Sequence, residues 1–291
     1  MDTDGGSGPS DHFGFVNTPT SSFAQYVNAV APDLLPGRQS LPPNADTSSI
    51  PHGTTIVATI YAGGVVMAGD RRVTQGNMIA IRDVEKVFPA DEYTAIGFAG
   101  AAGFGAELVR LYQVELEHYE KLEGASLSVD GKANRLSMLI RNHLGLAMQG
   151  LAVVPLLAAY DQDQQRGRIF SYEVTGGRYE ERGYEGVGSG SIFAKNALKK
   201  MFVQEASREQ AVLACLQALY DAAEEDSATA GPDALRKIYP LVVDVNETGY
   251  HQVSQEELGR FVEDILAGRA HRPDGPVAPV LPEAAEGSEQ S

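Results

Sequence analysis

Cysteine is almost absent from this chain of 291 residues, in which Cys215 is the single cysteine. A single cysteine can form neither an internal disulfide nor a CxxC motif, so an intracellular, cytoplasmic protein is expected. The chain also lacks an apolar run of about 18 residues, the length that a membrane-spanning helix requires. Its N-terminus has neither the basic nor the apolar region of a secretory signal. We therefore expect no association with a membrane.

Basic residues are scarce as well, with 23 Lys and Arg against 39 Asp and Glu, which gives a formal net charge of −16. Such an acidic chain suits the phosphate backbone poorly, so no nucleic-acid partner is expected. The six histidines show no ligand spacing, which argues against a metal site. The glycines between Gly97 and Gly105 do not follow the GxGxxG order of a dinucleotide loop, so no cofactor is expected. His143 and Cys215 lie on apolar helix stripes and are expected in the core.

Residues 1–53, called the leader below, differ in composition from the rest of the chain. They are rich in Gly, Ser, Pro, Thr and Asp, which indicates a mostly mobile segment. One short helix is predicted within the leader, because apolar residues at helical spacing follow two possible capping serines: Ser21 and Ser22, then Phe23, Tyr26, Val27 and Val30. Residues 270–291 are predicted to form a flexible tail, because Pro273, Pro276, Pro279 and Pro282 fall at every third position within them. The folded unit is therefore expected at residues 54–269.

Within this unit, strands alternate with pairs of helices. The predicted order is strands at 55–61, 65–68 and 94–98, helices at about 106–121 and 136–147, strands at 153–160, 168–174 and before 188, helices at 193–202 and from Ser207, a hairpin at 239–253 and a last helix after Ser254. Pairs of sequential helices between runs of strands do not suit a βαβ sheet. We therefore expect helical layers on the outside of two packed sheets.

The junction His52-Gly53-Thr54-Thr55 joins the leader to a strand of the buried type. If the bond between Gly53 and Thr54 is cut, Thr54 carries both a nucleophilic hydroxyl and an α-amine with a pKa of about 7.7–8.0, which can act as the base. Gly53 has no Cβ to hinder attack by the Thr54 hydroxyl on its carbonyl, so the same hydroxyl can make the maturation cut. A lysine cation beside the threonine would lower the proton affinity of both groups, and a carboxylate would orient that lysine.

Lys86 and Asp70 are candidates for this charged pair, and a glycine N–H in the turn at 97–101 could stabilise an oxyanion. Taken singly, each of these residues is more typical of a structural role. Asp70 alone reads as a turn residue, and Lys86 alone reads as a solvated charge.

Several motifs at matching separations point to one family. They are Thr54-Thr55-Ile56-Val57, Gly64-Val65-Val66-Met67-Ala68-Gly69-Asp70-Arg71-Arg72, Gly76-Asn77-Met78, Gly188-Ser189-Gly190-Ser191 and Asp226-Ser227-Ala228-Thr229. From Thr54 to about Ile265 the chain resembles the β subunits of 20S proteasomes, especially the actinobacterial type, and the leader resembles the propeptide of that group. The resemblance implies an α+β fold of the N-terminal nucleophile hydrolase type, a four-layer αββα sandwich.

The resemblance also implies a threonine endopeptidase made as a zymogen and cut autocatalytically between Gly53 and Thr54. It implies Thr54 as the nucleophile and Gly100 as the oxyanion donor. The remaining implied catalytic residues are the charged pair Asp70 and Lys86 and a polar network around the amine formed by Ser189, Asp226 and Thr229. Thr229 stands where the family often has serine.

For substrate binding, the resemblance implies that the backbone of Thr74 pairs with bound peptide. It implies a first specificity pocket lined by Val73, Val84, Phe98 and Ala102. These side chains are apolar, so a preference for apolar residues before the cut bond is expected.

The implied partners are those of a large assembly. Seven β subunits would form a ring, two such rings would stack, and rings of α subunits would cap both ends. A ring-shaped ATPase would deliver substrates, which would be unfolded or tagged proteins and peptides.

Other hypotheses stay open. A simpler bacterial ATP-dependent threonine protease works without α subunits and also begins Thr-Thr-Ile, although the long leader and the C-terminal helix and tail count against it. A catalytically silent scaffold subunit would be expected to lack Thr54, Asp70 or Lys86. A metabolic amidase of the same fold class would act on a small amide rather than on unfolded protein.

Overall fold

The computed structural model describes residues 20, 22–32, 35 and 53–277. Most of the leader lies outside these residues, as do residues 278–291 of the predicted tail. The predicted mobility of both segments therefore stays a prediction.

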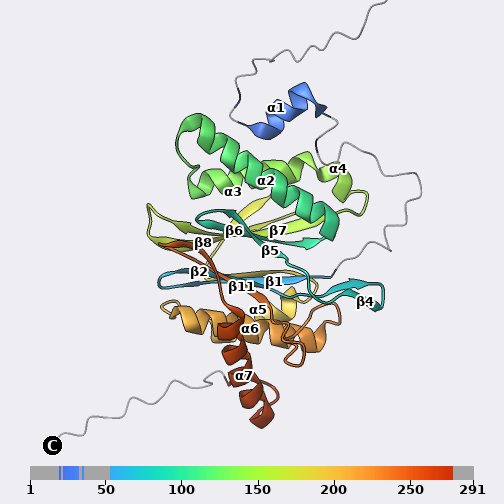
Figure 1. The fold of residues 1–291 in the computed structure, drawn as a ribbon, viewed down its shortest axis with the longest axis vertical. Helices are drawn as coiled ribbons and strands as arrows, with labels where there is room; N and C mark the ends of the chain where they lie inside the picture. Colours follow the sequence, from blue (N-terminus) through green and yellow to red (C-terminus); the bar gives the residue numbers. More distant parts are fainter. Residues whose placement is uncertain (1–19, 21, 33–34, 36–52, 278–291) are drawn as a thin grey trace, which may run out of the picture.

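Two five-stranded antiparallel sheets form the centre of the molecule (Figure 1). The first sheet contains, in spatial order, β10 (Tyr184–Gly188), β1 (Thr55–Tyr61), β2 (Gly64–Gly69), β11 (Leu241–Asn246) and β12 (Gly249–Gln252). The second contains β5 (Val87–Asp91), β6 (Thr94–Gly100), β7 (Val153–Asp161), β8 (Arg166–Tyr172) and β9 (Arg178–Glu181).

Helices cover the outer face of each sheet (Figure 1). Over the second sheet lie α2 (Ala102–Glu123), α3 (Val129–Asn142) and α4 (Leu144–Ala147). Under the first sheet lie α5 (Ser191–Met201) and α6 (Arg208–Glu225), and α7 (Gln255–His271) packs beside α6. The predicted four-layer αββα sandwich is confirmed.

Three apolar cores fill the three boundaries between these layers. Strand β1 contributes to two of them, because successive side chains of a strand point to opposite faces of its sheet. Val57 packs toward α5 and α6, whereas Ile56 and Ala58 pack between the two sheets. A strand buried on both faces reads as a continuous apolar run, and β1 and β2 both have this pattern.

The prediction of one continuous helix through residues 136–147 is wrong in one respect. The structure has two helices there, separated at His143. Helix α3 ends at Asn142 and the short α4 starts at Leu144. The backbone N–H of His143 bonds to the carbonyl of Ile140 at 3.0 Å, and the imidazole Nδ1 lies 2.6 Å from the carbonyl oxygen of Leu139. The side chain thus takes the place of the backbone bond that would continue the helix. His143 is buried, as predicted.

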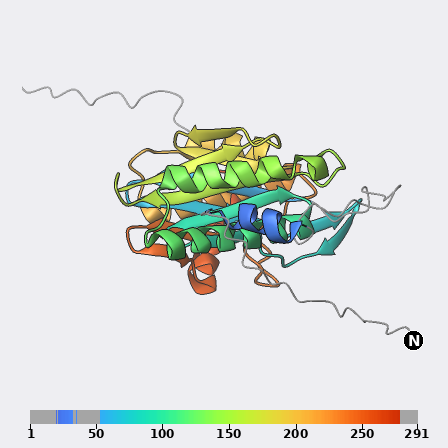
Figure 2. The same ribbon diagram turned by 90° about the horizontal axis from the view of Figure 1, so that it is seen from above.

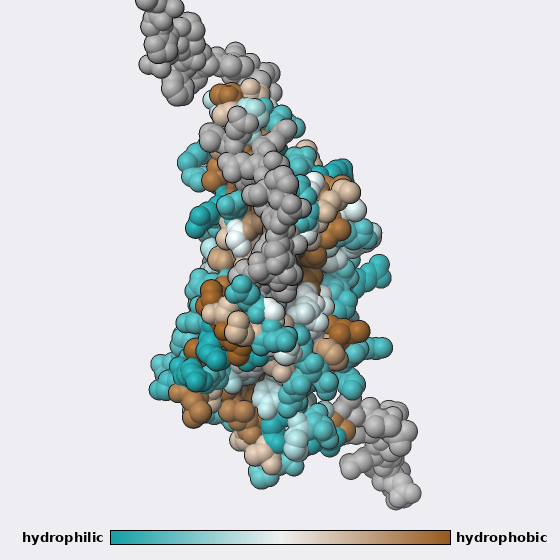
Figure 3. All heavy atoms as spheres, turned by 90° about the vertical axis from the view of Figure 1, so that its right-hand side faces the viewer, coloured by the Kyte–Doolittle hydropathy of each residue, from teal (hydrophilic) through white to brown (hydrophobic). Residues whose placement is uncertain are grey.

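A second difference is the hairpin of β3 (Val73–Gln75) and β4 (Met78–Ile81), which the sequence pattern did not reveal. Its strands are short, and all four residues of β4 are exposed, so neither periodicity nor burial marks them. The hairpin projects from the edge of the sandwich in Figure 1. Figure 3 faces that side of the molecule, where apolar side chains stand in small groups among hydrophilic ones.

The helix starts agree with the capping signals in the sequence. Ser207 and Gln210 form the complete capping box of α6. Ser254 caps α7 by accepting from the N–H of Glu257. In the leader, Ser22 caps α1 (Phe23–Val30), and this helix lies on the helical layer formed by α2 and α3 (Figure 2). No helix within the described ranges is long and apolar enough to cross a membrane.

Candidate active site

Thr54 lies where three segments of the first sheet end together. It directly precedes β1, and β1 is paired with β2 on one side and β10 on the other. The register places Ile56 opposite Gly69 and Thr55 opposite Gly188. The residues after β2 and after β10, which include Asp70 and Ser189, are therefore brought beside Thr54 by strand pairing alone.

The carbonyl of Gly53 is held by two donors. The hydroxyl of Thr54 donates to its oxygen at 2.6 Å, and the Nζ of Lys86 donates to the same oxygen at 3.0 Å. The carbonyl of Thr54 accepts from the N–H of Ser189 at 3.0 Å. Thr54 itself is only 7% exposed. The peptide bond between Gly53 and Thr54 is thus fixed on both sides, with its carbonyl polarised by a cation and a hydroxyl.

Lys86 and Asp70 form a buried ion pair beside this bond. The distance from Nζ to Oδ1 is 2.6 Å, and the two side chains are 3% and 0% exposed. Burial lowers the pKa of Lys86 below its usual value, although the charge of Asp70 opposes this effect. Nζ also donates to the carbonyl of Arg72, so three acceptors fix its position.

Both oxygens of the Asp70 carboxylate accept two hydrogen bonds each. Oδ1 accepts from the N–H of Thr55 at 2.8 Å in addition to Lys86, and Oδ2 accepts from the N–H groups of Arg72 and Ala230 at 2.9 and 3.0 Å. A buried carboxylate with four donors is held in one position. Asp70 therefore joins the start of β1, the end of β2 and the loop after α6.

Asp226, at the C-terminal cap of α6, organises a second network. Its Oδ2 accepts from the hydroxyls of Ser189 and Thr229, each at 2.6 Å, and its Oδ1 accepts from the N–H of Ala228 at 3.1 Å. Burial by itself would raise the pKa of Asp226, but the bonds from Ser189, Thr229 and Ala228 and the charge of Arg72 bring it below the usual value. The sequence-predicted residues Ser189, Asp226 and Thr229 are therefore in contact.

Thr55 connects this network to the start of β1. Its Oγ1 lies 2.6 Å from the Oγ1 of Thr229 and accepts from the N–H of Gly190 at 2.9 Å. The Thr229 hydroxyl has one proton and gives it to Asp226, so the Thr55 hydroxyl is the donor between the two threonines. Thr229 has the same hydroxyl as the serine that often stands at this position in the family, so it can make both of these hydrogen bonds.

Arg72 is a site residue to which the sequence reading assigned no role. Its Nη1 donates to the carbonyls of Ser227 and Thr229, both at 3.0 Å. The guanidinium thus anchors the 227–230 loop, while the backbone of Arg72 contacts Asp70 and Lys86. The only sequence feature that could have indicated this role was its place in the motif Gly69-Asp70-Arg71-Arg72. An arginine after a turn aspartate is otherwise typical of a solvated surface.

Two glycines allow the chain to approach itself closely at this site. Gly53 has φ of +107°, and a Cβ there would lie 2.7 Å from the Oγ1 of Thr74 and 3.0 Å from the Cβ of Ala228. Gly188 has φ of +105°, and a Cβ there would lie 1.8 Å from the carbonyl oxygen of Thr54. Both positions therefore require glycine. The first contact also places Thr74 directly against the junction.

The other predicted substrate-binding residues are more widely placed. Val73 is buried at the start of β3, and Val84 is half-buried, its N–H bonded to the carbonyl of Arg71 at 3.1 Å. Phe98 is 6% exposed and stacks on Phe88 with ring centroids 5.9 Å apart, inside the core that faces α2. Their role in a specificity pocket stays a prediction.

Gly100 ends β6 with φ of +120°, and a Cβ there would lie 2.1 Å from the carbonyl oxygen of Ala152. Ala102, two residues later, opens α2 and is half-buried. Residue 97 of the same strand lies against the site, because a Cβ on Gly97 would be 2.8 Å from Ile56 and 3.3 Å from the carbonyl of Lys86. Strand β6 thus runs past Lys86 toward the turn that carries Gly100. No group of three or more His, Cys, Asp or Glu suited to a metal ion occurs in the described part of the chain.

Comparison with known proteins places the chain that carries this site in a family. A family model described as "Proteasome subunit" matches residues 50–235, which include the whole site. The chain belongs to the proteasome subunit family. Its relatives in this family are β subunits by name. A protein of Streptomyces griseus named "Proteasome subunit beta" is 55% identical over 267 residues, which cover 92% of this chain and 95% of that protein.

Two further β subunits are equally similar. The "Proteasome subunit beta" of Streptosporangium roseum is 56% identical over 91% of this chain and 94% of its own. That of Acidothermus cellulolyticus is 54% identical over 97% of this chain and 100% of its own. The identity extends over nearly the whole length in each case. This chain is accordingly a β-type subunit of the proteasome core, and the proteolytic function expected of that subunit is supported.

Proposed function

We propose that this β-type subunit is a threonine endopeptidase whose nucleophile is Thr54, freed when the chain cleaves itself after Gly53. The observation that carries the proposal is the geometry of the Gly53–Thr54 bond. Its carbonyl oxygen accepts from both the Thr54 hydroxyl and the Lys86 Nζ, at 2.6 and 3.0 Å. The Lys86 cation polarises the carbonyl and stabilises the oxyanion that addition would form, while the hydroxyl contact holds the Thr54 oxygen close to the carbon that it would attack.

The proposed self-cleavage begins with attack of the Thr54 oxygen on the carbonyl carbon of Gly53. A water molecule takes the hydroxyl proton, and Lys86 stabilises the oxyanion. The bond from the carbon to the Thr54 nitrogen then breaks, the nitrogen takes up that proton, and the acyl group is left on the Thr54 oxygen as an ester. Water hydrolyses the ester, which yields the Gly53 carboxylate and restores the Thr54 hydroxyl beside a free α-amine.

The mature residue then cleaves substrates by the same route. The amine has a pKa of about 7.7–8.0 in an ordinary terminus, and the Lys86 cation beside it lowers that value, so the amine can accept the hydroxyl proton near neutral pH. The network of Asp226, Ser189 and Thr229 would orient this amine. Gly100 as oxyanion donor and the apolar pocket of Val73, Val84, Phe98 and Ala102 belong to the same proposal.

The assembly partners are proposed on the strength of the family. The chain is expected to join a proteasome core particle, in seven-membered β rings that stack and are capped by α rings, with a ring-shaped ATPase delivering unfolded or tagged protein. The division into a leader of residues 1–53, a catalytic unit of 54–269 and a tail, and a cytoplasmic location, form part of this proposal. The α-independent protease remains the alternative, and sedimentation with and without an α subunit separates the two.

Substitution of Thr54 tests the nucleophile. Thr54→Ala should abolish peptidase and casein-degrading activity, because alanine has no nucleophilic oxygen. Thr54→Ser keeps the oxygen and should retain measurable activity, which serves as the matched control for assembly and folding. Activity retained by assembled Thr54→Ala particles would exclude the mechanism and favour another nucleophile. A particle that cleaves small amides but not casein would instead favour the amidase hypothesis.

A further inference from the structure

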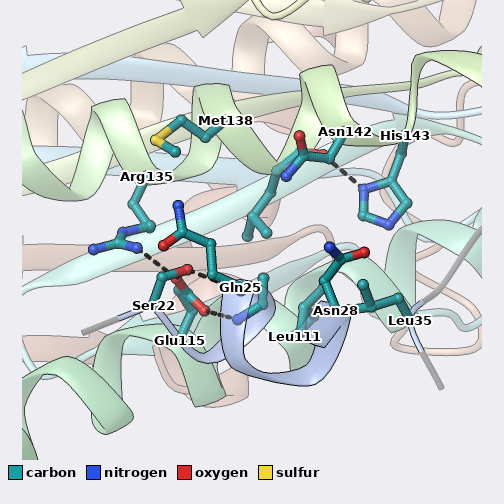
Figure 4. A pocket seen from close by; sticks show the side chains of 12 residues that line it. Ser22, Gln25, Asn28, Leu35, Leu111, Glu115, Arg135, Met138, Asn142 and His143 are labelled. Carbon is teal, nitrogen blue, oxygen red and sulfur yellow. Dashed lines mark hydrogen bonds and ion pairs between the residues drawn. The ribbon is translucent and has the colours of Figure 1, made fainter. Parts of the chain in front are cut away.

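Helix α1 of the leader is bound to the catalytic unit through one buried carboxylate. Glu115, on α2, is 0% exposed. Its Oε1 accepts from the hydroxyl of Ser22 at 2.7 Å, and its Oε2 accepts from the N–H of Ala24 at 2.7 Å. Figure 4 shows the start of α1 directed at this carboxylate. The contact joins residues about ninety positions apart in the sequence, so it is a tertiary contact of the leader.

Arg135, on α3, makes the carboxylate a fixed acceptor. Its Nη1 lies 2.7 Å from the Oε1 of Glu115, and its side chain is 15% exposed. The charge of Glu115 is therefore balanced from the catalytic unit itself, while two of its acceptor positions face the leader. When the leader is absent, Glu115 loses two of these three donors, and water must replace them. The leader therefore offers this carboxylate fixed donors in place of solvent.

Helix α1 also fits this site in its charge. The N-terminus of a helix carries a partial positive charge and unpaired N–H groups, which an acidic residue in the first turn usually satisfies. The first turn of α1 has no acidic residue, and Glu115 of α2 supplies that charge from outside. Helix α1 has eight residues, and an isolated helix of that length is marginal in water. Its fold therefore depends on this contact.

The remaining contact between α1 and the catalytic unit is incomplete. Ala24 is buried, Phe23 meets His118 edge-on at 5.7 Å between ring centroids, and Val30 at the far end of the helix is 42% exposed. A pocket of about 340 Å³, open to solvent, lies between the helix and the layer of α2 and α3, bordered by Gln25, Asn28, Met138 and His143 (Figure 4). The three cores, by contrast, are made of buried side chains in close contact. The contact resembles a bound ligand held at one end more than a permanent part of the core.

We propose that Glu115 and Arg135 form a receptor for the start of the leader helix, so that the leader remains as a noncovalent ligand after the chain is cut between α1 and Thr54. The ligand class is a helix start that presents a serine hydroxyl at the N-cap and a backbone N–H two residues later. The relevance of this ligand rests on the proposed cut after Gly53, but its binding does not.

The test uses the full chain carrying Thr54→Ala, with a site for an added sequence-specific protease inserted within residues 36–52. Cutting at that site separates the leader without any chemistry at residue 54. Native mass spectrometry and gel filtration then measure whether the leader fragment stays with the rest of the chain. Hydrogen exchange at the Ala24 amide reports on the contact before the cut.

The parent chain should retain the leader fragment after cutting, whereas Glu115→Gln should weaken retention by about tenfold or more. Glutamine has one acceptor oxygen for the three donors, and its amide group must meet another donor. Ser22→Ala should weaken retention similarly. Glu117→Gln is the matched control, because Glu117 lies on the same helix, is exposed and pairs with Lys121. It should behave as the parent.

Loss of the leader from the parent chain immediately after cutting would overturn the proposal. Equal retention in the Glu115→Gln and Glu117→Gln chains would also overturn it, since the carboxylate would then not be the receptor. Circular dichroism on each uncut chain verifies that the catalytic unit is folded. Because every chain carries Thr54→Ala, a negative result leaves the proposed role of Thr54 unaffected, and the two proposals fail independently.

Discussion

At the scale of single residues, the carbonyl of Gly53 is the most informative group of the site. Lys86 and the Thr54 hydroxyl both donate to it, and Gly53 adopts a left-handed conformation with φ of +107°. In the proposed cut, the residue before the bond would contribute conformation, and the residues after it would contribute chemistry. This division allows the cut and the mature activity to be perturbed separately.

Gly53→Ala tests the conformational part. A Cβ at this position would meet Thr74 Oγ1 at 2.7 Å and adopt a strained backbone, so the carbonyl should move away from Lys86. Self-cleavage should slow by about tenfold or more, measured as a time course of intact mass. Each chain that is cut has the wild-type mature sequence, so peptidase activity per processed chain should not change. Unchanged cleavage kinetics would show that this geometry does not control the cut.

Lys86 gives the cut a dependence on pH. Its pKa lies below the usual 10.5 because burial penalises the cation, against the opposing effect of Asp70. The ammonium polarises the Gly53 carbonyl, so self-cleavage should decline as pH rises through a midpoint below 10.5. The cleavage rate of isolated precursor between about pH 7 and 10 measures this midpoint. Lys86→Met should cleave little at any of these values, and a cleavage rate equal to the wild type would contradict the role of Lys86.

At the scale of elements, the site depends on the ends of β2, β10 and α6 meeting at the start of β1. Strand register brings Asp70 and Ser189 to Thr54, whereas the 226–230 loop is held there by side chains. Asp226 bonds Ser189 and Thr229, and Arg72 bonds the carbonyls of Ser227 and Thr229. The loop after α6 is therefore the part of the site that is fixed by charge rather than by backbone pairing.

Asp226→Asn should lower the free energy of unfolding, because it weakens the hydrogen bonds that hold the 226–230 loop. The pKa of Asp226 is below its usual 3.8, so its stabilising contribution is complete above that value and is lost as pH falls through the folded-state pKa. The free energy of unfolding should differ between wild type and Asp226→Asn by about 1 kcal/mol at neutral pH, and the difference should vanish well below pH 4. Urea denaturation at several pH values measures it. A difference that grows on acidification would contradict the network.

Elements with local signals could be predicted from the sequence, and those without could not. The capping box of Ser207 and Gln210 and the hairpin turn at Asn246–Gly249 are encoded by adjacent residues, and both are confirmed. The break at His143 was missed because a histidine on an apolar stripe continues the helical period. Its imidazole competes for the Leu139 carbonyl only in three dimensions.

The apolar spacing of α1 also gave an incomplete picture. Phe23, Tyr26, Val27 and Val30 share helical spacing, but the buried residues at this contact are Ser22 and Ala24. A hydrogen-bonded helix start rather than an apolar stripe fixes the leader. The partner, Glu115, reads in the sequence as an ordinary helix surface charge, so this contact could be found only in the fold.

At the scale of the whole molecule, the alternation of strands and helix pairs was sufficient to predict four layers, and the three separate cores confirm them. The resemblance carried by the motifs predicted roles for Thr54, Asp70, Lys86, Ser189, Asp226 and Thr229, and the structure brings these residues into one hydrogen-bonded cluster. The roles of Arg72 and Thr55 were missed, because they act through backbone carbonyls and hydroxyls that spacing does not show. The substrate residues lie on several elements around the site, and their pocket stays a prediction.

The central claim is that Thr54 becomes an N-terminal residue by a cut after Gly53. The most direct measurement is the intact mass and N-terminal sequence of the chain purified from particles assembled with an α subunit, beside the Thr54→Ala chain as the uncut control. The account predicts a terminus at Thr54 in the wild type and an uncut leader in the variant. Assembled wild-type particles that retain the intact leader would contradict it, because Thr54 would then never gain the amine on which the mechanism depends.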